Sequence, residues 1–123
     1  MLTTNDQILV PKVWGYEKWI TNNEKYCGKI LHIVDRHHTS WHYHKIKDEV
    51  MYVQSGSVYI QYGYDEDINK ATTMTLEAGS SFHISVGLIH RITALEDSDV
   101  FEFSTQHFDE DSYRIDVNKN YGI

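Results

Sequence analysis

The chain has one cysteine, one proline and few basic residues. Because Cys27 stands alone, it excludes an internal disulfide and any zinc site made of cysteines only, so we expect a reducing, cytoplasmic setting. The 11 Lys and Arg against 18 Asp and Glu give a net charge of -7, which argues against nucleic acid as a partner. No apolar run approaches the roughly 18 residues of a membrane span, and Met1 to Gln7 lack the pattern of a secretory signal. We therefore expect a soluble protein whose partner is neither nucleic acid nor a membrane.

The length of the chain favours one domain. A chain of 123 residues buries roughly two thirds of the surface that it exposes when unfolded, which suffices for one core. No repeat, low-complexity tract or proline-rich linker divides the sequence. We expect a single domain over residues 1–123.

Short segments rich in aromatic and β-branched residues recur along the chain, with turn residues between them. The expected strands are residues 13–20, 26–34, 41–45, 49–54, 57–64, 71–76, 81–85, 90–95 and 100–105. The first two form a hairpin, and Gly56 allows the positive φ of a tight turn. Helix is expected only as a turn within 109–114, where acidic residues suit a helix N-terminus. The pattern predicts an all-β sandwich or small barrel.

Two of the eight histidines lie one residue apart and indicate a metal site. Because strand side chains alternate between faces, the imidazoles of His42 and His44 point the same way. Glu49 follows after a short loop, and a distant strand provides His90. Three imidazole nitrogens and one carboxylate oxygen suit a divalent Mn, Fe, Co, Ni or Zn ion and leave up to two positions for water or substrate. The alternative is that His42 and His44 are surface imidazoles and Glu49 is a solvated charge.

The spacing of these residues resembles the two motifs of the cupin superfamily. The matching segments are His42-x-His44-x4-Glu49-x6-Gly56 and Gly79-x5-Ser85-x-Gly87-x2-His90. The chain departs from the cupin pattern at three positions, where Arg36 replaces a Gly, Ser85 a Pro and Ala94 an Asn. None of the three is a ligand position, so the departures affect turns and one supporting contact.

The resemblance implies the double-stranded β-helix, or jelly-roll barrel, of the cupins. It implies one cupin domain with N-terminal strands in about 8–34, barrel motifs in about 30–105 and a short tail over 106–123. It also implies that His42, His44, Glu49 and His90 bind one divalent metal inside the barrel.

The flanking segments resemble one group of cupins, the cupin domain of type II mannose-6-phosphate isomerases. Residues 13–17 are similar to its Pro-Trp-Gly segment, although Pro11 here precedes Trp14 by three positions. Residues 79–92 and 102–105 are also similar to that group. This resemblance implies a metal-dependent isomerase that acts on a sugar or a sugar phosphate.

Such an isomerase needs a base that moves a proton between neighbouring carbons. The candidates, in order, are Glu102, His83 and His107. Each has a structural alternative: Glu102 faces solvent while Phe101 and Phe103 fill the core, or the histidines are hydrogen-bonded rim residues.

A phosphate on the substrate needs cationic partners. The candidates are Arg91, Lys45 and Lys12. Because Arg91 follows the ligand candidate His90 directly in a strand, alternation also allows it to point out of the barrel.

Other functions remain open at this stage. A non-haem Fe or Mn dioxygenase also needs an ion with two open positions, and a cupin can keep its ligands only for binding. The many aromatic residues stack on a sugar or fill the barrel and a subunit interface, with core or interface favoured for most of them. The cupin resemblance implies pairing through the outer sheets and N-terminal strands, so we expect a homodimer.

Overall fold

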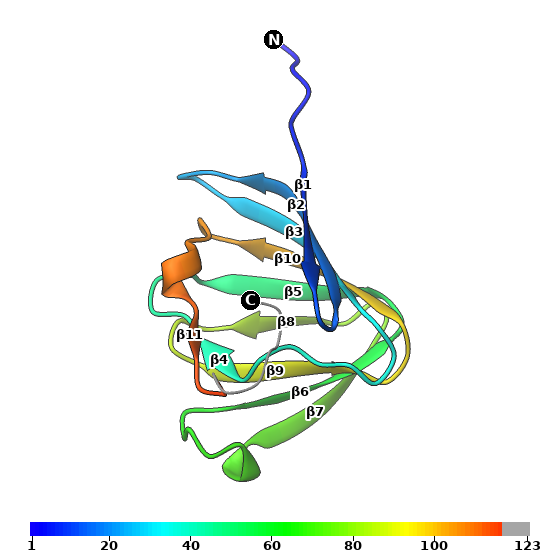
Figure 1. Ribbon diagram of the computed structural model, residues 1–123, viewed down its shortest axis with the longest axis vertical. Coiled ribbons are helices and arrows are strands. Elements are labelled where there is room, and N and C mark those ends of the chain that lie inside the picture. The colour runs from blue at the N-terminus through cyan, green and yellow to red at the C-terminus, as the bar shows by residue number, and fades with distance from the viewer. Residues whose placement is uncertain (117–123) are drawn as a thin grey trace.

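The computed structural model describes residues 1–116, which are mostly antiparallel strands (Figure 1). The strands are β1 (Ile8–Lys12), β2 (Gly15–Asn22), β3 (Cys27–Ile33), β4 (His42–Tyr43), β5 (Glu49–Ser55), β6 (Ser57–Gly63), β7 (Thr72–Glu77), β8 (Ser81–Ile84), β9 (Ile89–Ala94), β10 (Ser98–Ser104) and β11 (Tyr113–Arg114). Two short 3₁₀ turns, η1 (Ile68–Lys70) and η2 (Asp109–Asp111), interrupt them. The expected all-β class is confirmed.

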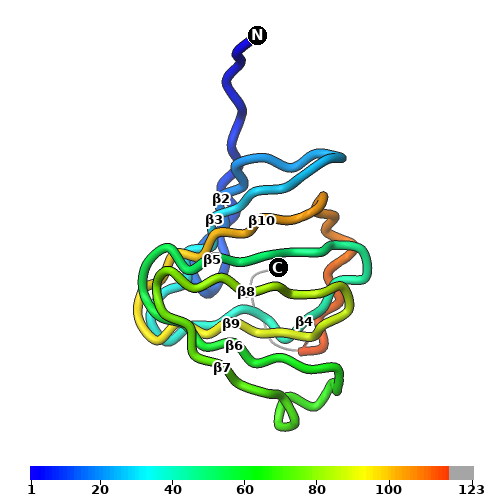
Figure 2. The backbone as a smooth tube through the Cα atoms, turned by 180° about the vertical axis from the view of Figure 1, so that it is seen from behind, coloured from blue at the N-terminus to red at the C-terminus, as the bar shows by residue number. Residues whose placement is uncertain are grey.

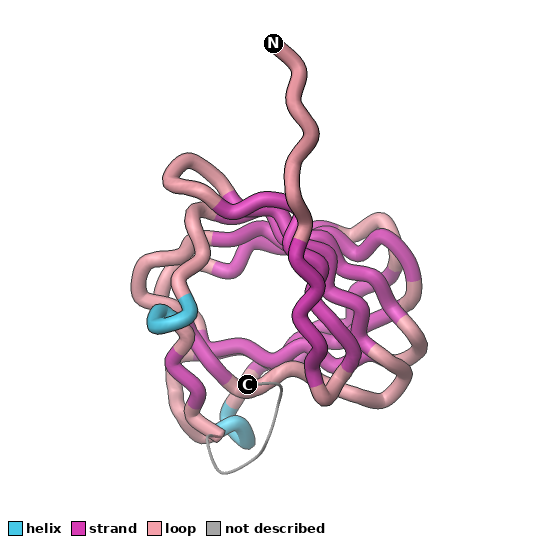
Figure 3. Tube along the Cα trace, turned by 45° about the horizontal axis from the view of Figure 1, so that its top comes forward, coloured by secondary structure: helices cyan, strands magenta, loops and turns pink. Residues whose placement is uncertain are grey.

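The strands form two sheets that enclose a common axis as a barrel (Figure 3). The six-stranded sheet has the order β1-β2-β3-β10-β5-β8, and the five-stranded sheet has the order β11-β4-β9-β6-β7. Strands distant in sequence are therefore neighbours, such as β10 between β3 and β5, as the tube in Figure 2 also shows. This order is that of a jelly roll, in which non-local pairing closes the barrel.

The inward-facing side chains change character along the barrel axis. Leu31 and Val100 are register partners and are buried, and two residues further along, Lys29 and Glu102 are register partners and are also buried. The apolar core comprises Trp14, Leu31, Ile33, Met51, Val53, Val58, Ile60, Ile84, Ile92, Ala94 and Val100. One end of the barrel is thus filled with apolar side chains, whereas the other end is lined with polar and charged ones.

The expected strands agree with the structure in position, except that the additional strand β1 precedes them and that three further places differ. The expected strand 41–45 is reduced to β4 (His42–Tyr43), after which the chain turns away as a loop. The segment 65–70, which has no strand pattern, contains the 3₁₀ turn η1 with Asp67 as its N-cap. The expected helical turn in the tail is the 3₁₀ turn η2, but it is followed at once by β11. The part of the expected tail beyond residue 116 lies outside the described residues.

Two turn positions have a left-handed backbone. Gly56, between β5 and β6, has φ +87°, and a Cβ there would clash with Ser98 and with the carbonyl of Asp97. Arg36 has φ +64° and is the one non-glycine residue of 1–116 with positive φ. This is the position at which the cupin pattern has glycine, so the fold keeps the conformation although the residue differs.

The N-terminal segment before β1 extends away from the barrel (Figure 1). Within residues 1–116, no helix has the length and apolarity needed to cross a membrane.

Candidate metal centre

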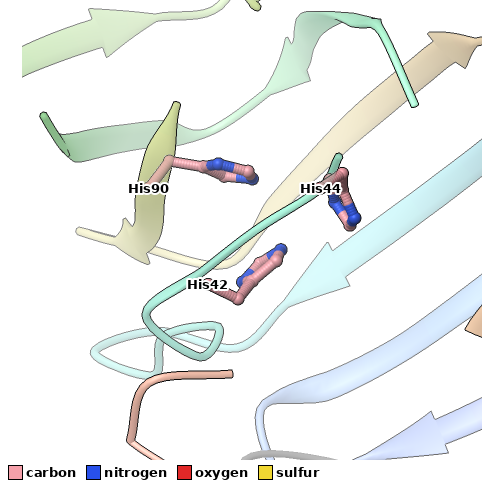
Figure 4. A group of neighbouring side chains, drawn as sticks. All are labelled: His42, His44 and His90. Atoms are coloured by element: carbon pink, nitrogen blue, oxygen red, sulfur yellow. The ribbon is translucent and has the colours of Figure 1, made fainter. Parts of the chain in front are cut away.

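Three histidines meet at the polar end of the barrel. His42 in β4 and His90 in β9 are register partners, and His44 follows β4 by one residue. One ring nitrogen from each lies within 4.8 Å of the others, and Figure 4 shows the three imidazoles facing a common point. This three-histidine group could hold a metal ion.

Backbone carbonyls fix the orientation of each ring. The Nδ1 atoms of His42, His44 and His90 lie 2.8, 3.0 and 2.9 Å from the carbonyl oxygens of Ser40, Asp111 and Leu88. Because a carbonyl oxygen only accepts, Nδ1 carries the hydrogen and Nε2 keeps its lone pair. Each ring therefore presents Nε2 as a ligand atom, which is how supporting contacts orient metal-binding histidines.

The three imidazoles are neutral at pH 7. Burial, together with the Lys47 charge, lowers the pKa of His44 to about 3 and that of His90 to about 4. Burial also lowers the pKa of His42 well below its usual value, and His90 and His44 add to this shift. A neutral imidazole needs to lose no proton before it binds a metal.

Glu49 begins β5 beside the histidines and is only 1 % exposed. Its Oε2 lies 3.5 Å from His44 Nε2, and its Oε1 lies 3.5 Å from His90 Nε2. Among the described residues, Oε2 has no hydrogen-bond partner, although Lys47 Nζ is 3.4 Å away. Burial and the Glu102 carboxylate outweigh the Lys47 charge and raise the pKa of Glu49 to about 8. A buried carboxylate whose two oxygens each face one lone-pair nitrogen, and one of which has no hydrogen-bond partner, fits a cation, so these donors suit a divalent metal.

Lys47 lies beside this group and is a residue that the sequence analysis missed. It is 3 % exposed, and its Nζ lies 3.0 Å from Glu102 Oε2 and 3.0 Å from His107 Nδ1. Burial lowers the pKa of Lys47, but the Glu102 and Glu49 carboxylates outweigh it and raise the pKa overall. Its position two residues before Glu49, where alternation favours the same face, was the available indication.

Glu102 is ionised and points inward. Burial would raise its pKa, but Lys47 and Lys29 outweigh burial and hold the pKa at about 2. Glu102 is 4 % exposed, whereas Phe103 is 57 % exposed. The alternative in which Glu102 faces solvent and Phe103 fills the core is therefore wrong.

These side chains line a cavity of about 350 Å³ at the polar end of the barrel. Of the candidates for base or phosphate binding, Glu102, His107 and Lys12 line it. His107 is held by Trp19, whose ring it meets edge-on, and by Asp109, 2.9 Å from its Nε2. The cavity volume is at the lower end of the range for small-molecule sites.

The other three candidates do not line the cavity. His83 is exposed on β8, where Phe82 and Ile84 point inward, and its Nε2 lies 2.6 Å from Asp48. Arg91 alternates with His90 and forms an ion pair with Asp116. Lys45 is exposed, with Nζ 4.5 Å from the ring of Tyr113. For His83 and Arg91, strand alternation turns the side chain outward, so the structure separates all three from the metal centre.

The segment 109–116 borders this end of the barrel. Asp111 accepts hydrogen bonds through its carboxylate from the backbone amides of Lys45, Ile46 and Lys47, in the loop between His44 and Glu49. Its carbonyl also holds His44, as described above. Asp116 accepts from the amide of Trp41, and β11 pairs with β4. A short segment without a strong sequence pattern thus fixes the loop that connects two of the candidate ligands.

Three solved structures are similar to this chain in fold. KdgF from Halomonas sp. superposes with a TM-score of 0.66 at 19% identity, over 77% of this chain and 81% of KdgF. The capsular polysaccharide assembling protein CapF from Staphylococcus aureus gives 0.75 at 17% identity, over 89% of this chain and 34% of CapF. A variant of oxalate decarboxylase from Bacillus subtilis gives 0.76 at 16% identity, over 92% of this chain and 31% of the enzyme.

All three are cupin-fold proteins. The chain has the cupin fold. It spans about a third of the CapF and oxalate decarboxylase chains. No protein-family model matches this chain, and no curated protein sequence matches it. Within the cupin barrel the three histidines are a possible metal site, and oxalate decarboxylase contains Mn(II) centres.

Proposed function

We propose that this cupin is a metal-dependent isomerase that acts on a sugar or a sugar phosphate. The main support is a single observation: three neutral imidazoles and the orphaned Glu49 carboxylate meet in a cavity that also holds the charged pair of Lys47 and Glu102. The similarity of residues 13–17 and 79–92 to type II mannose-6-phosphate isomerases adds to it. The cupins that resemble this chain include a capsular polysaccharide assembling protein, which is compatible with a carbohydrate substrate.

The proposed ligands are His42, His44, His90 and Glu49, and the ion is Mn, Fe, Co, Ni or Zn. When bound, such an ion supplies a Lewis acid that polarises a carbonyl or hydroxyl oxygen of the substrate. The chain itself keeps the three rings in one tautomer through Ser40, Asp111 and Leu88 and holds the loop to Glu49 in place.

Glu102 is the proposed base. Its carboxylate is ionised and lines the cavity, so it can take the proton from the carbon next to the carbonyl and return it to the former carbonyl carbon. A second proton moves between the two substrate oxygens, which completes the conversion of aldose to ketose. Because a pKa of about 2 makes Glu102 a weak base, substrate binding has to weaken its contact with Lys47. His107, 3.0 Å from the same Lys47 amine, is the next candidate.

The test begins with elemental analysis of anaerobically purified protein, followed by isomerase assays on mannose and mannose 6-phosphate with the metal found. Glu102→Gln keeps the shape and one hydrogen bond to Lys47 but removes the base, so we expect kcat to fall by about 100-fold or more. His83→Gln is the matched control, since His83 lies outside the cavity, and it should keep wild-type kcat.

Three results would contradict the proposal. Wild-type kcat in Glu102→Gln would remove Glu102 from the chemistry. Metal-dependent O₂ uptake without isomerisation would favour the dioxygenase. A ligand that raises Tm without any turnover would favour a binding protein.

For the assembly, the proposal is a homodimer that buries the outer face of the six-stranded sheet. Phe103 on β10 and Val50 on β5 are register partners, and both side chains are exposed. Phe101 and Tyr52, 6.3 Å apart, extend this apolar face. Monomeric proteins rarely expose such patches. Light scattering should give twice the monomer mass for the wild type and the monomer mass for Phe103→Glu; a wild-type monomer would contradict the dimer.

A further inference from the structure

Arg114 lies beside the candidate metal centre. It is in β11, which pairs with β4, and its register partner is His42. Directly opposed residues of an antiparallel pair place their side chains on the same face of the sheet. His42 faces the cavity, and Arg114 accordingly lines it too.

The charge of Arg114 is not matched by an acid of the described chain. Lys29 pairs with Glu17 at 3.3 Å, and Lys47 pairs with Glu102 at 3.0 Å. By contrast, no carboxylate of residues 1–116 forms an ion pair with the Arg114 guanidinium. Among residues 1–116, therefore, no acid competes with an anionic group in the cavity for the guanidinium.

A second cation adds to the positive charge at this place. Lys12, in β1, also lines the cavity. Burial lowers the pKa of Lys12, and the Arg114 charge lowers it further, although Glu17 opposes both. Two like charges that share a cavity wall repel each other, and an anion between them relieves the repulsion.

The cavity as a whole also favours anions once a metal is bound. Four cationic and four acidic side chains line it, namely Lys12, Lys29, Lys47, Arg114, Glu17, Glu49, Glu102 and Asp109. When all eight are ionised, as Glu49 would be if it bound a metal, these charges balance, so a divalent ion held there would leave the cavity with positive net charge. A positive cavity with low-dielectric walls attracts anions.

We infer that Arg114 binds the anionic group of the substrate, a phosphate or a carboxylate, next to the metal, with Lys12 as the second cation. Arg suits both groups because its planar fork donates two parallel hydrogen bonds to either. The inference rests on the proposed function and narrows its substrate class from sugars in general to sugar phosphates or sugar acids. It also replaces Arg91 and Lys45, which do not line the cavity.

The test is calorimetric binding to the metal-loaded full-length chain with three probes: mannose 6-phosphate, glucuronate and mannose. The wild type should bind at least one of the two anions at least 10-fold more tightly than mannose, and the stronger anion identifies the group. Arg114→Gln should weaken the binding of that anion by about 10- to 100-fold and leave the affinity for mannose unchanged. The anion affinity of Arg114→Lys should lie between those of the wild type and Arg114→Gln. Lys45→Gln, which removes a cation outside the cavity, should match the wild type.

Metal stoichiometry and Tm are measured for each variant, so that a loss of folding is not mistaken for a loss of the anion site. Wild-type anion affinity in Arg114→Gln, or no preference for either anion over mannose in the wild type, would overturn the inference. Isomerisation is assayed separately. Anion binding that depends on Arg114 without any isomerisation would contradict the proposed function and keep the anion site, whereas isomerisation of the preferred anion with a kcat/KM unaffected by Arg114→Gln would do the reverse.

Discussion

Asp111 offers the sharpest test of how the metal centre is built. Its side chain is buried, and its carboxylate accepts from the amides of Lys45, Ile46 and Lys47 at 2.9, 3.1 and 2.9 Å. These amides form the loop that joins His44 to Glu49. Asp111→Ala removes all three hydrogen bonds at once.

The cost follows from what each amide can do afterwards. Lys45 and Ile46 are exposed, so water can replace the carboxylate there, and each bond contributes about 0.5 to 1 kcal/mol net. The Lys47 amide is buried, so it is left without a partner at a cost of about 1 to 3 kcal/mol. We expect the free energy of unfolding to fall by about 3 kcal/mol in Asp111→Ala. Asp111→Asn keeps one acceptor oxygen and should lose about half as much.

Urea denaturation of chelator-treated protein at pH 7 measures this loss without a contribution from metal. Glu110→Ala is the matched control, because Glu110 is the exposed neighbour and its removal changes the net charge equally. If the free energies of unfolding of Asp111→Ala and Glu110→Ala differ by less than about 0.5 kcal/mol, the Asp111 carboxylate does not hold the loop. Metal affinity provides a second measurement, since a loosened loop should weaken binding in Asp111→Ala and not in Glu110→Ala.

The pH dependence of the same variant has a fixed sign. Burial alone would raise the pKa of Asp111, but the hydrogen bonds from the Lys47, Lys45 and Ile46 amides outweigh burial and lower it. A group with a lowered folded pKa adds stability above its unfolded value and loses it as the pH falls through the folded value. The difference between wild type and Asp111→Ala should therefore be largest near neutral pH and shrink below about pH 4. A difference that grows on acidification would contradict this explanation.

Three further predictions concern other residues. Arg36→Gly should raise the free energy of unfolding by about 0.5 to 1 kcal/mol, because φ +64° strains any residue with a Cβ; a lower urea midpoint would refute this. Lys47→Met should lower the free energy of unfolding by about 3 to 5 kcal/mol at pH 7, because the buried Glu102 loses its cation, and the loss should shrink as acid protonates Glu102; a pH-independent loss in urea titrations would contradict this. His42→Ala and Glu49→Ala should each lower metal content in elemental analysis, and chelator should lower the wild-type Tm; full metal content in both variants would exclude the proposed ligands.

Local sequence rules predicted much of the fold and part of the site. The alternation of side chains along strands gave His42 and His44 one common face, and the structure brings both imidazoles together with His90. Alternation does not say which of the two faces is inside. At β10 it allowed either Glu102 or its phenylalanine neighbours to point inward, and only the packed barrel turned Glu102 into the cavity.

The residues that the sequence analysis missed are those whose role depends on a distant partner. Lys47 matters because β10 brings Glu102 to it, and Asp111 matters because the tail returns to the loop after His44. Arg114 is placed beside His42 by the pairing of β11 with β4, which are about 70 residues apart in the chain.

The sequence by itself therefore determined an all-β chain of cupin pattern with His42, His44, Glu49 and His90 as candidate ligands, because spacing and alternation are local properties. Only the tertiary structure decided which charged side chains share the cavity with them, because strand order and register are set by the closure of the whole barrel. Glu102, Lys47 and Arg114 were brought in by that closure, while His83, Arg91 and Lys45 were left outside.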